Sequence, residues 1–130
     1  MTDVEKEILK GLLSTIENIS NVDFQQKGWI EGKIHPYCFF EETMHQFFDD
    51  YEAKEVIDNY KDYGITHTQY KLLSKLYKYL DKYAEAKMSW YDSADPKQIL
   101  ADPKWHKIQK IAKEVLEVFN YFGSRNDHTT

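Results

Sequence analysis

The sequence has very little cysteine and very little arginine. Cys38 is the only cysteine, and Arg125 is the only arginine among 17 basic residues. A single cysteine excludes an internal disulfide, which indicates a reducing compartment. Arginine is the preferred residue for bidentate contacts to phosphates and base edges. Its scarcity, together with a net charge of −5, argues against direct binding of nucleic acid.

Long apolar runs are also missing. A membrane-spanning helix needs roughly 18 or more consecutive apolar residues, and no stretch of the sequence approaches that length. The first residues, MTDVEKEILKGLL, contain acids and lack the basic start and small-residue cleavage site of a signal peptide. We therefore expect a cytoplasmic protein that has no membrane partner.

The sequence lacks the common catalytic motifs. It has no glycine-rich phosphate loop, no His-Glu-x-x-His pair and no nucleophile elbow. These absences predict a non-catalytic protein that needs no cofactor.

One segment resembles a metal site, because residues 35–48 hold two histidines, a cysteine and two glutamates. A di-metal helical bundle takes Glu-x-x-His from two helices, and here only Glu42 and His45 have that spacing. Cys38 and His45 are seven residues apart, which is about 10 Å along a helix and too far for one ion. We predict no metal site, and keep His35, Cys38 and His45 as the alternative ligand set.

Helical periodicity is what the sequence does have, since apolar residues recur every three or four positions almost throughout. The predicted helices cover residues 2–20, 36–63, 66–87 and 103–122, with a short turn at 96–100. The apolar pattern shifts phase at 49–50, so residues 36–63 are expected to form one long helix that bends there or two helices that abut. Residues 21–34 are expected to form a loop, with one helical turn near Phe24. This pattern predicts an all-α protein: an antiparallel bundle of four main helices with one or two extra short turns. The bundle forms a single domain over residues 1–123, and 124–130 form a polar tail.

The predicted helix ends rest on local signals. Thr2 with Glu5, and Thr66 with Gln69, have the spacing of a capping box. Gly64 and Gly123 follow helical stretches and are natural terminators.

Charge is unevenly distributed along the chain. Residues 41–62 carry eight acids against Lys54 and Lys61, whereas residues 66–113 carry ten lysines against five acids. Tyrosines are interleaved with the acids, and such a surface suits a basic protein partner: carboxylates speed encounter and tyrosine rings supply rigid contact area. The alternative is a solvated helix face whose tyrosines complete the core. The predicted partner-binding residues are Asp49, Asp50, Tyr51, Glu52, Glu55, Asp58, Tyr60, Asp62 and Tyr63.

The segment DDYEAKEVIDNYKDYG, residues 49–64, together with the size and acidity of the chain, resembles the small all-helical immunity proteins of bacteria. These include the immunity proteins of nuclease colicins and of contact-dependent inhibition systems. The resemblance is one of overall character, so no residue roles are carried over from the family. It implies an inhibitor that occludes a basic toxin domain, such as a nuclease, with an acidic helical face that bears tyrosines.

Two other functions remain open. The aromatic content of 15% also suits a structural or regulatory bundle that self-associates, for example as a homodimer. A small metal- or ligand-binding enzyme is the third interpretation, with a pocket near Trp29, Phe39, Trp90 and Trp105.

Overall fold

The computed structural model describes residues 1–31, 40–87 and 95–121. Within these ranges the chain forms helices and turns and no strand, which confirms the all-α prediction. The α-helices are α1 (Asp3–Ser20), α2 (Val22–Gln25), α3 (Phe40–His45), α4 (Ala53–Asp58), α5 (His67–Lys87), α6 (Pro96–Ala101) and α7 (Pro103–Val118). Two π-helical turns, η1 (Gln26–Ile30) and η2 (Gln46–Asp50), and one 3₁₀ turn, η3 (Tyr60–Tyr63), extend them. No described helix is both long and apolar enough to cross a lipid bilayer.

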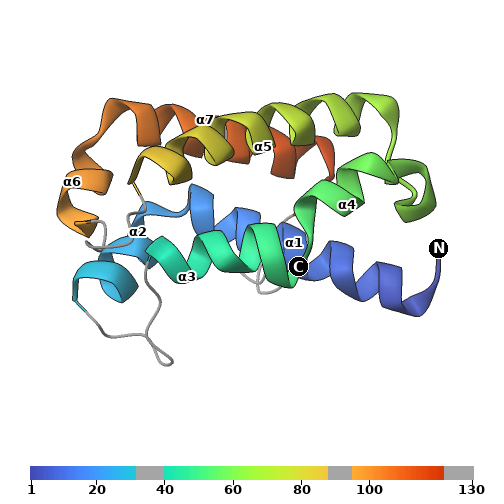
Figure 1. The fold of residues 1–130 in the computed structure, drawn as a ribbon, viewed down its shortest axis with the longest axis horizontal. Coiled ribbons are helices and arrows are strands. Elements are labelled where there is room, and N and C mark those ends of the chain that lie inside the picture. The colour runs from blue at the N-terminus through green and yellow to red at the C-terminus, as the bar shows by residue number, and fades with distance from the viewer. Residues whose placement is uncertain (32–39, 88–94, 122–130) are drawn as a thin grey trace.

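Helix α7 packs against both α1 and α5, and so joins the two other long helices among the described residues. Figure 1 shows α5 and α7 side by side along one edge of the molecule, with α1 and α3 along the other. Helix α4 packs against α5, and η2 and η3 both contact α1. The acidic segment between η2 and η3 is therefore held by the N-terminal helix and by α5.

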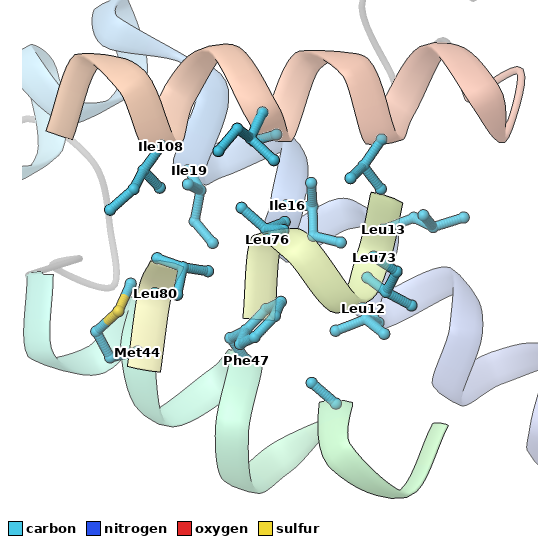
Figure 2. Packing of buried hydrophobic residues seen from close by; sticks show 14 of the residues in the cluster. Leu12, Leu13, Ile16, Ile19, Met44, Phe47, Leu73, Leu76, Leu80 and Ile108 are labelled. Atoms are coloured by element: carbon cyan, nitrogen blue, oxygen red, sulfur yellow. The ribbon is translucent and has the colours of Figure 1, made fainter. Parts of the chain in front are cut away.

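The core is built from the apolar stripes that the periodicity predicts. Figure 2 shows Leu12 and Ile16 of α1, Phe47 of η2, Leu76 of α5 and Ile108 of α7 converging between the helices. All five are at most 1% exposed. Burying one such side chain stabilises the fold by roughly 1.5–3 kcal/mol, so the position of η2 is fixed by the same core that holds the long helices.

Both predicted capping boxes are confirmed. The Thr2 N–H donates to Glu5 Oε1 at 2.7 Å, and the Glu5 N–H donates to Thr2 Oγ1 at 3.1 Å. The corresponding bonds between Thr66 and Gln69 are 2.8 and 3.2 Å long. Each box satisfies two backbone donors that the first turn of a helix leaves free.

The predicted terminator Gly64 is confirmed, because it adopts the left-handed conformation with φ of 67°. The Ile65 N–H then donates to the carbonyl of Tyr60 at 3.0 Å, as expected for a Schellman motif.

The predicted end of the last helix was wrong. Helix α7 stops at Val118, because Asn120 takes the left-handed conformation with φ of 53°. The Tyr121 N–H donates to the carbonyl of Leu116 at 2.9 Å, which closes a second Schellman motif. Asparagine tolerates this conformation better than most residues. Gly123, the expected terminator, lies outside the described residues.

The prediction of a loop after residue 21 was also wrong for most of its length. The expected turn near Phe24 is α2, but the chain continues through the π-helical turn η1. Both elements are held by Gln25, which is completely buried. Its Nε2 donates to the carbonyls of Asn18 and Ile19 at 2.8 and 2.7 Å.

The side-chain oxygen of Gln25, Oε1, accepts two further hydrogen bonds. It accepts from Trp105 Nε1 at 3.1 Å and from Gln109 Nε2 at 2.9 Å, both on α7. An amide side chain offers two donors and two acceptor sites, and all four are used here. The Gln25 side chain therefore links the C-terminal turn of α1 to α7 through buried hydrogen bonds.

The second predicted helix, over residues 36–63, is divided into α3, η2, α4 and η3. Its phase shift at residues 49–50 falls in η2, since a π-helical turn adds one residue to the helical repeat. Glu52 follows in the left-handed conformation with φ of 46° and redirects the chain into α4. This conformation is unfavourable for a residue with a side chain. The predicted start of the helix at Pro36 lies outside the described residues.

Candidate protein-binding surface

All six acids of the predicted site are exposed. They are carried by η2, α4, η3 and the junctions between these elements, and are Asp49, Asp50, Glu52, Glu55, Asp58 and Asp62. The tyrosines differ from one another: Tyr51 and Tyr60 are half-buried, whereas Tyr63 is only 7% exposed and belongs to the core. Only the first two rings can contribute contact area at this surface.

Tyr63 shows that the carboxylates gather in space as well as in sequence. Burial of its ring raises the pKa of the Tyr63 phenol above its ordinary value, and nearby carboxylates raise it further. Those carboxylates belong to Glu55, Glu5, Glu52 and Asp62. Glu5 comes from the first turn of α1, and sequence reasoning missed it because only the packing of α1 against η3 brings it there.

The ring of Tyr60 is held by α5. It stacks on Tyr70 with centroids 4.3 Å apart and an interplanar angle of 26°. Tyr70 in turn stacks on His67, with centroids 5.7 Å apart. A ring fixed in this way loses little conformational entropy on binding, which favours its use as an anchor.

The ring of Tyr51 is held by α1. It lies directly over Gly11, so closely that a β-carbon at that position would overlap Cε1 of the ring. Glycine inside a helix costs about 1 kcal/mol relative to alanine. The contact explains its presence, because no larger residue leaves space for the tyrosine.

A groove of about 640 Å³ opens beside this contact. Its apolar lining comes from Val4, Ile8 and Tyr51, and Val4 is 68% exposed. The polar lining residues are Asp3, Glu7, Lys10, Ser14 and Asp50. The groove therefore continues the acidic segment onto α1.

A shallower depression of about 510 Å³ lies on α4, lined by Glu52, Lys54, Glu55, Asp58 and Asn59. Lys54 Nζ lies 3.0 Å from Asp58 Oδ2, with both side chains well exposed. The hydrogen bond to Asp58 raises the pKa of Lys54. An exposed pair of this kind contributes little to stability, and Asp58 remains accessible.

The alternative metal ligands are only partly described. His45 is exposed and its Nδ1 lies 3.0 Å from Asp49 Oδ2, one helical turn away. His35 and Cys38 lie outside the described ranges. Among residues 1–31, 40–87 and 95–121, no group of three or more His, Cys, Asp or Glu side chains is placed to hold a metal ion.

Two of the four aromatics proposed to line a pocket pack together instead. Trp29 and Trp105 have centroids 5.9 Å apart, and Phe40 lies 5.9 Å from the first and 5.6 Å from the second. Tyr83 stacks on Trp105 at 5.5 Å. All four rings are at most 5% exposed, so they form part of the core. Phe39 and Trp90 lie outside the described residues.

Comparison of the chain with protein-family models, with curated proteins and with solved structures gave no match.

Proposed function

We propose that this protein is a non-catalytic binding module, an inhibitor of the immunity or antitoxin type that occludes a basic toxin domain. The observation that carries the proposal is the exposed acidic segment at residues 49–62 with two fixed tyrosine rings. Six exposed carboxylates attract a cationic partner and orient it. Tyr51 and Tyr60 then offer pre-organised aromatic area, which is typical of binding hot spots.

The scaffold in this proposal is an antiparallel four-helix bundle. Its members are α1, the α3–η2 unit, α5 and α7, and the contacts of α7 with α1 and α5 support the arrangement. Such a bundle is a rigid support, and rigid support keeps the cost of ordering the surface low.

The mechanism is competition for cations. If the partner is a nuclease, its substrate phosphates are bound by lysine and arginine. Carboxylates on this surface pair with the same cations and exclude the nucleic acid, or cover the surface next to them. The proposal places both proteins in the cytoplasm.

The test starts with a low-salt pull-down from the native organism, with identification by mass spectrometry. We expect one small basic protein, retained stoichiometrically. The variant Asp50→Lys/Glu55→Lys/Asp58→Lys should weaken its binding by about 100-fold or more, because attraction becomes repulsion at three positions. Isothermal titration calorimetry with the purified partner measures the change.

The matched control is Asp81→Lys/Glu85→Lys/Glu117→Lys. It changes the net charge equally, and its three acids are exposed on α5 and α7. The control should bind within about threefold of the wild type. An equal loss of binding in both variants would show that binding depends only on net charge. No loss of binding in either variant would overturn the proposal.

The two other interpretations predict different results from the same preparation. A mass that rises with protein concentration would indicate a self-associating bundle. A stoichiometric metal or small molecule after purification would indicate a ligand-binding protein and return attention to His35, Cys38 and His45.

A further inference from the structure

The groove between α1 and Tyr51 has a mixed chemistry that the acidic segment alone does not have. Val4 projects from the first turn of α1 with 68% of its surface exposed. Ile8 follows one turn later, and the Tyr51 ring forms the opposite wall. These three side chains supply the apolar part of the groove lining.

The rim of this groove is predominantly acidic. Asp3 and Glu7 lie on the α1 side and Asp50 on the η2 side, and among the residues that the structure describes Lys10 is the only basic one in the lining. A neutral apolar ligand gains nothing from such a rim, and an acidic ligand is repelled by it. The ligand that complements both features carries an apolar side chain flanked by positive charges.

The groove is also pre-formed. The Tyr51 ring rests on the backbone of α1 at Gly11, and Tyr51 follows η2, which is fixed through the buried Phe47. Binding therefore does not have to order the wall of the groove, and affinity is not reduced by that cost.

We propose that this groove receives a basic segment of the partner protein, and that an aliphatic or aromatic side chain of that segment inserts between Val4, Ile8 and Tyr51 while its lysines or arginines pair with Asp3, Glu7 and Asp50. The inference rests on the proposed function and adds to it. It extends the interface from η2 and α4 onto α1, and it defines the chemistry of the partner segment.

The experiment uses two fluorescein-labelled peptides of about 12 residues and equal positive charge. The first has leucines at helical spacing between its lysines, and the second has glutamine in place of each leucine. Fluorescence anisotropy with the full chain should show binding of the leucine peptide about tenfold tighter than that of the glutamine peptide. Amide shifts in ¹⁵N spectra should move at Val4, Ile8 and Gly11 with the leucine peptide.

The variant Val4→Ser removes the exposed apolar side chain without touching the core. It should abolish the preference for leucine and leave the weaker, salt-sensitive binding of both peptides unchanged. Val22→Ser is the matched control, since Val22 is also an exposed valine, at 50%, on α2 away from the groove. The control should retain the preference.

The outcomes separate this inference from the proposed function. If Val4→Ser leaves the leucine preference intact, or if neither peptide is preferred, the groove assignment is overturned, whereas the charge-reversal result with the native partner is unaffected. If the native partner ignores charge reversal, the proposed function fails whatever the peptides do. A leucine-dependent increase in mass to twice that of the chain would assign the groove to a second copy and also overturn the inference.

Discussion

At the scale of single residues, the most informative contact is that between Gly11 and Tyr51. Glycine is the poorest helix former apart from proline, and here it lies in the middle of α1. The tyrosine ring occupies the space that a β-carbon would fill. A weak helix former at position 11 is thus what allows the half-buried Tyr51 ring to lie at a fixed position against α1.

Substitution of Gly11 by alanine tests this relation. In the wild type we expect Gly11→Ala to lower the free energy of unfolding by about 1–2 kcal/mol, because the displaced ring loses its packing. In the Tyr51→Ala background the same change should raise it by up to about 1 kcal/mol, as helix propensity alone predicts. Urea unfolding of the four proteins measures both values. Stabilisation in both backgrounds would show that the ring moves aside without cost.

At the scale of elements, Asp102 joins α5 to the start of α7. Its Oδ1 accepts the Lys104 N–H at 2.9 Å and so caps α7, while its Oδ2 accepts the Tyr83 hydroxyl at 2.9 Å. Lys87 Nζ lies 3.7 Å from the same oxygen. The backbone N–H of Lys104 lowers the pKa of Asp102, and the Tyr83 hydroxyl and Lys87 lower it further against the opposing effect of burial.

This shift predicts a pH dependence of stability. Since the pKa is lower in the folded state, the unfolded chain binds the proton more readily, and stability rises with pH in this window. The contribution is complete above the ordinary value of 3.8 and is lost as pH falls through the folded value. We expect Asp102→Asn to be less stable than the wild type by about 1 kcal/mol at pH 7. Urea unfolding at decreasing pH should show the two proteins converge below pH 3.8; a difference that stays constant would contradict the prediction.

The same scale shows which elements the sequence could predict. Helix α5 begins where its signal indicates, because the capping box formed by Thr66 and Gln69 is local. For the second predicted helix, the phase shift indicated a bend or two abutting helices at residues 49–50, but the detail was not predictable. A π-helical turn and the left-handed Glu52 depend on packing against α1 and α5. The end of α7 was missed because Asn120 takes a conformation that glycine was expected to supply.

The candidate site was likewise predictable only where its features are local in the sequence. Six exposed acids and the two half-buried tyrosines were visible in the sequence as a local run. The burial of Tyr63, the approach of Glu5 and the groove beside Val4 were not, because each of them requires α1 to lie against η2 and η3. Contacts between segments so distant along the chain leave no trace in periodicity or spacing.

At the scale of the whole molecule, the acidic surface opposes stability. The net charge is −5, and the carboxylates of Glu55, Glu5, Glu52 and Asp62 all raise the pKa of the Tyr63 phenol. Neighbouring like charges repel one another, and salt screens this repulsion. The acidic surface that suits a basic partner therefore lowers the stability of the free protein.

Neutralising two of these acids should therefore raise the stability of the free protein. We expect Glu52→Gln/Asp62→Asn to raise the midpoint of thermal unfolding by about 2 °C at low ionic strength, because repulsion around Tyr63 is relieved. The gain should vanish in high salt. Circular dichroism melts at both ionic strengths measure it. The control Asp81→Asn/Glu85→Gln removes two acids from lysine-rich α5 and should show no gain; equal gains in both variants would contradict the argument.

The saturated amide of Gln25 also bears on the order in which the chain assembles. Its two donors find acceptors within seven residues, whereas its two incoming bonds come from residues 80 and 84 positions further along. Until α7 docks, a buried Gln25 would have an oxygen without donors, and an unsatisfied buried group is costly. Burial of Gln25 and docking of α7 are therefore expected to be coupled. Contacts of such sequence separation slow folding, so we expect the step that joins Gln25 to α7 to be slow.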